Sequence, residues 1–227
     1  MDNNTIFETT ECRLDMLSAS WAERIVIYLS SEQFGESGII IKNAVENMVE
    51  VPVTFCELVV NDWDRYLTPW KADINMNNRV FIGEGVKLLT ILKTRIIPKI
   101  TEYVSDARIY IAGYSLAGLF ALWSLYESDI FEGCACCSGS LWYPGWEEYT
   151  QHHDLKHDCC VYLSLGKKEK RTKHPVMQSI EDNMLQEYEQ LEQNKRVKRV
   201  QMDWNEGGHF NNIDGRMESG ISWLISE

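Results

Sequence analysis

The stretch that decides the fold is ARIYIAGYSLAGLFA, residues 107–121. Residues 107–112 form a short apolar run with β-branched side chains, which predicts a buried strand. Residues 116–126 carry apolar side chains at helical spacing, which predicts a helix. Only a few residues around Ser115 join the two. The sequence therefore predicts a strand that enters a helix through a tight turn with a serine at its apex.

A turn this tight places demands on the residues around the serine. The apical residue takes a strained backbone conformation, and its neighbours two positions away on either side must be small. Gly113 and Ala117 meet that demand, although glycine is more usual at the second position. Ser115 then projects its hydroxyl at a helix N-terminus, where the N–H of Leu116 can donate to an oxyanion. This pattern is typical of a serine nucleophile, and the alternative is an ordinary strand–turn–helix unit with a serine by chance.

Length and charge bound the class of protein. The 227 residues suit a single α/β domain over residues 1–227 and are enough to bury a full core. The net charge of −12 argues against nucleic acid as a partner and gives no reason to expect binding to anionic membranes. No apolar run approaches the ~20 residues of a membrane span, and the polar start MDNNTIFETTE does not resemble a signal peptide. We therefore expect a cytoplasmic protein.

Cysteine usage agrees with that compartment. The seven cysteines are an odd number and mostly lie in apolar runs, which indicates reduced, buried thiols. A metal site is the alternative for the cluster CACC at residues 134–137. Neighbouring residues of a strand point to opposite faces of its sheet, which disfavours shared ligation. We expect neither a metal nor another cofactor.

Apolar runs alternate with helical patterns along the chain. Besides the serine strand, strands are predicted at residues 24–30, 38–41, 53–60, 133–137, 159–165 and 197–204. Helices are predicted at residues 78–104 (interrupted at Pro98), 116–126, 175–193 and 213–225. This alternation predicts a mostly parallel sheet with helices on both faces and a site at the carboxyl ends of the strands.

A serine hydroxyl needs a base within hydrogen-bond reach, and the base needs an acid that orients it. His209 follows the last predicted strand, in NEGGHFNN, where two glycines let the loop bend over the sheet edge. A solvated loop histidine is the alternative. The other histidines lie earlier in the chain, at His152, His153, His157 and His174. Position after the last strand therefore favours His209 as the base.

The acid is expected in a loop after a late strand. Glu169 fits, because it follows the strand at residues 159–165 after Gly166, whose flexibility lets the chain turn back over the sheet edge. The alternative is that Glu169 is a solvated charge in the run KKEKR. Asp203 and Glu206 lie close to His209 in the sequence and are rival acids. We favour Glu169.

The remaining candidates concern the oxyanion and the substrate. In addition to the Leu116 N–H, a second oxyanion donor is expected in residues 61–64, which follow the third predicted strand. Trp63 is our candidate for it. Several aromatic residues could wall a substrate pocket or simply pack the core. They are Trp63, Tyr66, Trp70, Trp142, Tyr143 and Trp146, of which we favour Trp142, Tyr143 and Trp70.

Four segments together resemble the esterase family of α/β-hydrolases that includes enterochelin esterases and esterase D. They are GYSLAGLFALW, FEGCACCSGSLWYPG, VYLSLGKKEKRTKHPVM and EGGHF, and the resemblance covers most of the chain from about Val53 onward. It implies the α/β-hydrolase fold. It also implies Ser115 as nucleophile, His209 as base and Glu169 as acid, at a position where many members carry aspartate.

These observations predict a serine carboxylic-ester hydrolase that forms an acyl-enzyme with a small-molecule ester or thioester. Acyl transfer to another alcohol would use the same groups. The alternative from another class is a catalytically inactive hydrolase fold used for binding, and the intact Ser115, Glu169 and His209 argue against it. We expect the protein to lack the extra N-terminal domain of enterochelin esterases, and few basic residues lie near the predicted site. A generic carboxylesterase is therefore expected rather than an enzyme for triscatecholate anions.

Overall fold

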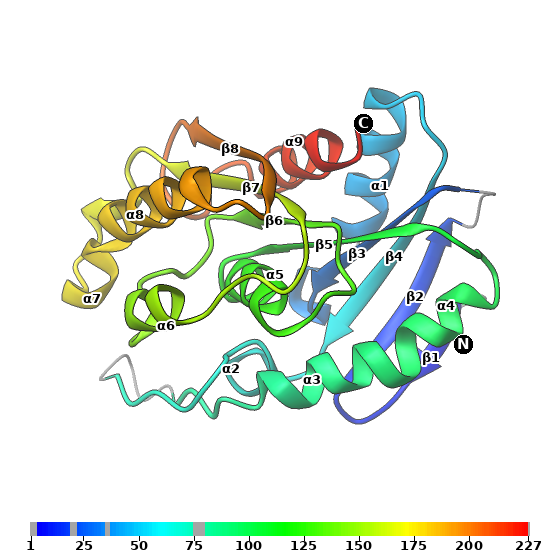
Figure 1. Ribbon diagram of the computed structural model, residues 1–227, viewed down its shortest axis with the longest axis horizontal. Helices are drawn as coiled ribbons and strands as arrows, with labels where there is room; N and C mark the ends of the chain where they lie inside the picture. Colours follow the sequence, from blue (N-terminus) through cyan, green and yellow to red (C-terminus); the bar gives the residue numbers. More distant parts are fainter. Residues whose placement is uncertain (1–3, 19–21, 35–36, 75–79, 227) are drawn as a thin grey trace.

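The computed structural model describes residues 4–18, 22–34, 37–74 and 80–226. Within these ranges it forms an eight-stranded sheet in the order β1-β2-β4-β3-β5-β6-β7-β8, with helices on both faces (Figure 1). All neighbours from β4 to β8 pair in parallel, and β2 pairs antiparallel with β1 and β4. The predicted mostly parallel sheet is confirmed. The strands are β1 (Thr5–Glu8), β2 (Cys12–Ser18), β3 (Arg24–Ser30), β4 (Val53–Val60), β5 (Arg108–Tyr114), β6 (Gly133–Cys137), β7 (Cys159–Gly166) and β8 (Val197–Asn205).

The central strands are buried along their length. Every residue of β3, β4, β6 and β7 is buried, because helices cover both faces of this part of the sheet. This is why these strands read as continuous apolar runs in the sequence. In contrast, β2 alternates buried Cys12, Leu14 and Met16 with half-buried residues, which is the pattern of a strand with one covered face. Neither β1 nor β2 was among the predicted strands.

The first helix corrects a prediction. Residues 38–41 do not form a strand but belong to α1 (Ser37–Met48). Ile41 and Val45 are buried four positions apart, whereas Ile39 and Ile40 are about half exposed. The apolar run is therefore one turn of an amphipathic helix, a case that a short run cannot distinguish from a strand.

Helices form a layer on each face of the sheet. On one face, α1 and α9 (Ile213–Ile225) pack against each other and over the central strands, and their buried residues form one apolar cluster. On the other face, α3 (Gly85–Ile91), α5 (Leu116–Glu127) and α8 (Ile180–Gln193) contribute to a larger cluster. The other α-helices of the described residues are α2 (Trp63–Tyr66), α4 (Ile97–Thr101), α6 (Trp146–His152) and α7 (Pro175–Gln178).

The helical stretch predicted over residues 78–104 is interrupted shortly before Pro98, as we predicted. The structure has α3, then a π-helical turn over Leu92–Ile96, then α4, while residues 78 and 79 lie outside the described ranges. The N–H of Ile97 bonds the carbonyl of Leu92, five residues back. Because Pro98 lacks an N–H and crowds the preceding turn, the wider turn accommodates it without ending the helix.

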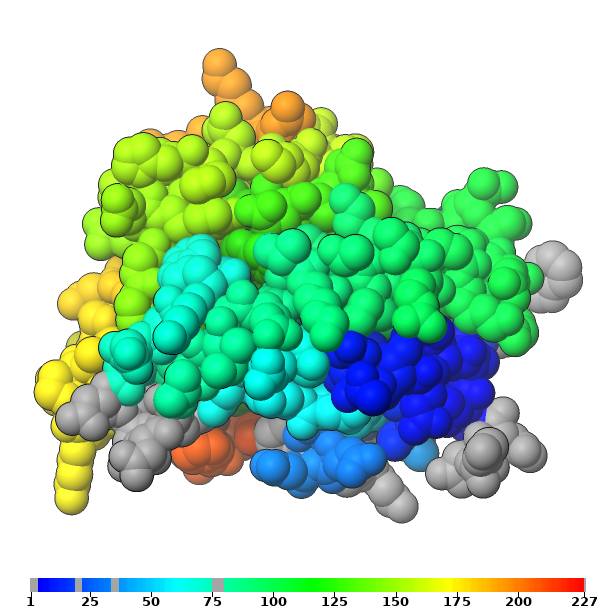
Figure 2. Space-filling model, turned by 90° about the horizontal axis from the view of Figure 1, so that it is seen from below, coloured from blue at the N-terminus to red at the C-terminus, as the bar shows by residue number. Residues whose placement is uncertain are grey.

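The same segment holds the β1–β2 hairpin in place. Figure 2 shows the α3–α4 segment, in green, running alongside the hairpin, in blue. The Arg95 guanidinium lies 4.8 Å from the centre of the Phe7 ring, and Lys87 Nζ lies 2.9 Å from a Glu11 carboxylate oxygen. A cation–π contact and an ion pair therefore supplement the strand pairing at this antiparallel edge.

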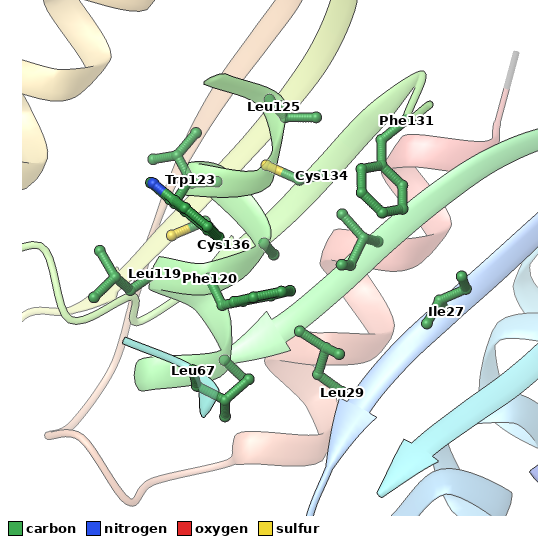
Figure 3. Packing of buried hydrophobic residues seen from close by; sticks show 14 of the residues in the cluster. Ile27, Leu29, Leu67, Leu119, Phe120, Trp123, Leu125, Phe131, Cys134 and Cys136 are labelled. Carbon is green, nitrogen blue, oxygen red and sulfur yellow. The ribbon is translucent and has the colours of Figure 1, made fainter. Parts of the chain in front are cut away.

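Helix α5, which follows the serine, is the most deeply packed helix. All its residues from Leu116 to Tyr126 are buried. Figure 3 shows Phe120 and Trp123 of α5 beside Cys134 and Cys136 of β6. A helix buried on all sides cannot tilt without opening the core, so it holds the turn before it rigidly.

The seven cysteines are all free and buried, as predicted. Burial raises the pKa of Cys12 to about 11 and that of Cys56 to about 12, which keeps these thiols protonated. In the part of the chain that the structure describes, no three or more His, Cys, Asp or Glu residues are grouped to hold a metal ion. No helix in those residues is long and apolar enough to cross a bilayer.

One buried carboxyl ties α8 to the core. Glu187 accepts hydrogen bonds from the Tyr126 hydroxyl and the Trp146 indole N–H, both at 3.0 Å. Burial raises its pKa from 4.5 to about 7, against the opposing effect of these two donors. Between those values the folded protein binds more protons than the unfolded chain, so its stability falls as pH rises.

We predict that Glu187 makes the free energy of unfolding fall by about 3 kcal/mol between pH 4.5 and pH 7. Urea unfolding at several pH values would measure this. Glu187→Gln removes the titration and should flatten the pH dependence, whereas Glu189→Gln, at an exposed position of the same helix, should keep the wild-type dependence. Equal slopes for wild type and Glu187→Gln would contradict the prediction.

Candidate active site

The turn between β5 and α5 has the predicted strain. Ser115 has φ 59° and ψ −120°, a backbone conformation that side chains rarely adopt. A Cβ added to Gly113 would lie 2.4 Å from the backbone carbonyl of Ala117, so only glycine fits there. The Ser115 N–H donates to the Cys137 carbonyl at 3.1 Å, which fastens the turn to the end of β6.

The structure brings His209 to the serine. Its Nε2 lies 3.1 Å from Ser115 Oγ. The loop after β8 bends at Gly207, which has φ +90°. The backbone of His209 is also held in place, because the Tyr114 hydroxyl donates a hydrogen bond to its carbonyl at 2.7 Å. The imidazole is therefore fixed over the end of β5.

Glu169 lies against the other ring nitrogen. Its Oε2 is 2.8 Å from His209 Nδ1, within the hydrogen-bond range expected of a triad acid. Its Oε1 accepts from the Gly166 N–H and the Ser138 hydroxyl, each at 2.7 Å. Burial alone would raise the pKa of Glu169, but the hydrogen bond and charge of His209, with those other donors, lower it below its ordinary value. The carboxyl is therefore ionised at neutral pH.

Two of the lysines near Glu169 have ion-pair partners at the surface. Lys167 pairs with Glu206, and Lys170 lies 2.6 Å from a Glu181 oxygen at the surface. The two rival acids have other partners: Glu206 has this surface ion pair, and Asp203 accepts from the Tyr162 hydroxyl at 2.8 Å.

The remaining histidines lie away from the serine. The rings of His152 and His153 bond carbonyls one helical turn back, at 2.7 and 2.8 Å, and the ring of His157 lies 3.2 Å from a Glu132 oxygen. His174 precedes α7 at its N-cap position.

The second oxyanion donor needs a correction. Because β1 and β2 precede them, residues 53–60 form the fourth strand and not the third. The sheet order places β3, not β4, next to β5. Trp63 follows β4, and its indole N–H donates to the Ser30 carbonyl at 3.3 Å, so it packs against the end of β3. The loop beside the serine strand is the one that starts at Ser31.

The aromatic candidates divide between two places. Trp142 lines a cavity of about 250 Å³ beside Glu169 and His209. Tyr143 is buried and donates its hydroxyl to the Trp70 carbonyl at 2.5 Å, and Trp70 lines a separate surface depression. Those two residues therefore support the chain around the site and do not line its cavity, contrary to our prediction.

Among the residues at this cavity that were not predicted, three differ from the expected surroundings of the site. Phe210, next to His209, is 84% exposed at the cavity mouth. Lys168 and Arg171 also border the cavity, which corrects the expectation of few basic residues near the site. Because KKEKR reads as plain surface, its sequence carries no signal that two of its cations adjoin a cavity.

Arg216 is the other residue that sequence reasoning missed. It is fully buried, and its Nη1 lies 2.8 Å from Glu169 Oε1. A signal was available, because the helical spacing of Met217, Ile221 and Leu224 marks the buried face of α9, and residue 216 lies beside it. A charged residue adjoining an apolar helix face is a reason to look for a buried partner.

Comparisons with known proteins bear on the fold. Neither a family model nor a curated protein sequence matches the chain. Siderophore hydrolase EstB from Aspergillus nidulans superimposes with a TM-score of 0.72 at 14% identity, covering 95% of this chain and 90% of that one. An IroE-like serine hydrolase from Shewanella oneidensis gives 0.73 at 16% identity, with 93% and 74% covered. A ferulic acid esterase gives 0.61 at 13% identity, with 98% and 95% covered.

The chain has the α/β-hydrolase fold. The fold implied by the sequence resemblance is therefore confirmed. In this α/β-hydrolase fold Ser115, Glu169 and His209 follow the ends of β5, β7 and β8. Serine, acid and histidine therefore occur in the chain order that is typical of the fold.

We predict that Gly113→Ala destabilises the protein by about 1–3 kcal/mol, because the added Cβ overlaps the Ala117 backbone and the turn must open. Urea denaturation would measure the change. Gly208→Ala is the matched control, since its added Cβ would meet nothing closer than 3.8 Å. Equal stabilities of the two variants would contradict a steric requirement at Gly113.

Proposed function

We propose that this protein is a serine carboxylic-ester hydrolase that works through an acyl-enzyme on Ser115. The observation that carries the proposal is the continuous chain of hydrogen bonds from Ser115 through His209 to Glu169. The similar structures are those of a siderophore hydrolase, a serine hydrolase and a ferulic acid esterase, and this likeness supports an esterase activity.

In this proposal His209 Nε2 removes the proton of Ser115 as its oxygen attacks the ester carbonyl. The ionised Glu169 holds the ring in the required tautomer, with the proton on Nδ1, and stabilises the imidazolium that forms. His209 then protonates the leaving alcohol, or thiol of a thioester. A water molecule, activated by the same imidazole, attacks the acyl-enzyme and releases the acid.

Two backbone segments are proposed to stabilise the tetrahedral oxyanion. The first is the N–H of Leu116 at the start of α5, where helix geometry leaves backbone donors without intrahelical acceptors. The second is the loop that starts at Ser31. The parallel register that pairs Tyr28 with Ala112, continued along both strands, brings Ser31 level with Ser115. We therefore replace Trp63 by backbone N–H groups of residues 31–33 as the second donor.

The cavity beside His209 is proposed to hold part of the ester. Trp142, Met177, Ile180 and Phe210 give it an apolar lining, which suits an apolar or aromatic group of a small-molecule substrate. We place the protein in the reducing cytoplasm because its seven cysteines are free and buried.

A fluorophosphonate probe should label the wild-type protein on Ser115, because only an activated serine reacts with it. Ser115→Ala should lose both labelling and p-nitrophenyl acetate turnover while keeping its melting temperature within a few degrees. Ser124→Ala, a buried serine of the same helix, is the matched control and should be labelled like wild type. A wild-type protein that neither reacts with the probe nor hydrolyses esters would instead favour a catalytically inactive binding fold.

A further inference from the structure

The Arg216 side chain is fully buried, and its contacts all lie in the segments that carry the site. Its Nη1 lies 2.8 Å from the Tyr114 hydroxyl, 2.7 Å from Ser138 Oγ and 2.8 Å from Glu169 Oε1. Its Nη2 lies 3.0 Å from the Gly208 carbonyl and 3.4 Å from the Glu206 carbonyl. One guanidinium on α9 thus connects β5, the end of β6, the loop after β7 and the loop after β8.

The directions of these hydrogen bonds follow from the chemistry of arginine, which has donors only. The hydroxyls of Tyr114 and Ser138 therefore accept from Arg216, whose two Nη1 hydrogens are shared among these hydroxyls and Glu169 Oε1. Each hydroxyl directs its own hydrogen to another acceptor. Tyr114 donates to the His209 carbonyl, and Ser138 donates to Glu169 Oε1. Arg216 consequently orients both the backbone of the base and the carboxylate of the acid.

The two oxygens of Glu169 have separate partners. Oε1 receives the donors of Arg216, Ser138 and Gly166, whereas Oε2 faces His209 Nδ1. Rotation of the carboxylate would break three bonds at once, so Oε2 is held toward the imidazole. The positive charge of Arg216 also opposes protonation of this buried carboxyl.

We propose that Arg216 is a positioning residue for the reaction, which fixes the Glu169 carboxylate and the His209 loop in the geometry that activates Ser115. The inference rests on the proposed serine hydrolase function. Burial of the Arg216 guanidinium carries a desolvation free energy that an apolar residue beside Met217 and Ile221 would not carry. The cost is explained if the charge and the fork of donors serve the site.

Other titratable groups surround this network and enter any pH dependence. On the sheet they are Tyr114 (β5), Cys137 (β6), Tyr162 (β7) and Asp203 (β8). In the loops after β7 and β8 they are Lys167, Lys168, Glu206 and His209. None of them replaces the contact that Arg216 makes with Glu169 Oε1, so removing the guanidinium leaves that oxygen with uncharged donors.

The first test compares Arg216→Lys with Arg216→Met. Lysine keeps the charge but loses the fork, so kcat should fall by about 10²-fold with little change in KM, as for a small misplacement of reacting groups. Methionine also removes the charge, so the acidic limb of the pH profile of kcat/KM should shift toward higher pH by about one pH unit or more. Millimolar guanidinium should restore part of the activity of Arg216→Ala. A role in packing alone predicts lower stability with an unmoved pH profile and no rescue.

The second test asks whether Arg216 acts through Glu169. In a Glu169→Gln background, Arg216→Met should lower kcat much less than it does in the wild type, because the group it positions is already disabled. Full multiplicative losses would overturn the proposal. Arg24→Lys is the control for a buried arginine, since Arg24 begins β3 at the opposite end of the sheet, and it should leave kcat and the pH profile unchanged.

A readout without turnover separates this inference from the proposed function. The proton on His209 Nδ1, hydrogen-bonded to Glu169, should give a far-downfield NMR signal in Ser115→Ala protein. Adding Arg216→Lys should broaden or remove that signal, whereas adding Arg24→Lys should not. A signal unaffected by Arg216→Lys overturns the positioning role. An inactive wild type with an Arg216-dependent signal overturns only the hydrolase function.

Discussion

The strained turn at Ser115 is the constraint on which the rest of the site depends. A side chain held at positive φ costs on the order of 1–3 kcal/mol, and the surrounding structure must supply that energy. It does so through Gly113, which leaves room for the Ala117 backbone, and through α5, which is buried on all sides. The hydrogen bond from the Ser115 N–H to the end of β6 adds a third constraint on the turn. The hydroxyl therefore has one position relative to the sheet.

Around this fixed point, chain segments far apart in sequence meet through a buried charge pair. Glu169 and Arg216 lie 2.8 Å apart below the imidazole, where water does not screen them. Removing either partner would leave the other charge buried and unpaired, so the two stabilise each other's position. Their shared partners hold the loop of His209. The position of the His209 imidazole is thereby set by groups of the core and not by its own loop alone.

Local signals in the sequence were enough for the fold and for the three residues that meet at the site. The strand–turn–helix around Ser115, the loop after the last strand and the flexible Gly166 each depend on neighbouring residues alone. The errors came from features that depend on tertiary context. The one-sided strand β2 lacks an apolar run, and residues 38–41 are too short to distinguish helix from strand. The wrong strand count that resulted led us to expect the second oxyanion donor after β4, at Trp63, and not after β3, where we now propose it. Arg216 contacts Glu169 only because α9 packs across the sheet.

The most direct test of the central claim is the mass of the protein during turnover. Esters of p-nitrophenol have a good leaving group, so acylation of the serine is fast relative to its hydrolysis. Samples quenched in acid in the pre-steady state should gain the mass of one acyl group, and peptide mapping should place it on Ser115. Ester turnover without such an adduct, or with the acyl group on another residue, would contradict the account.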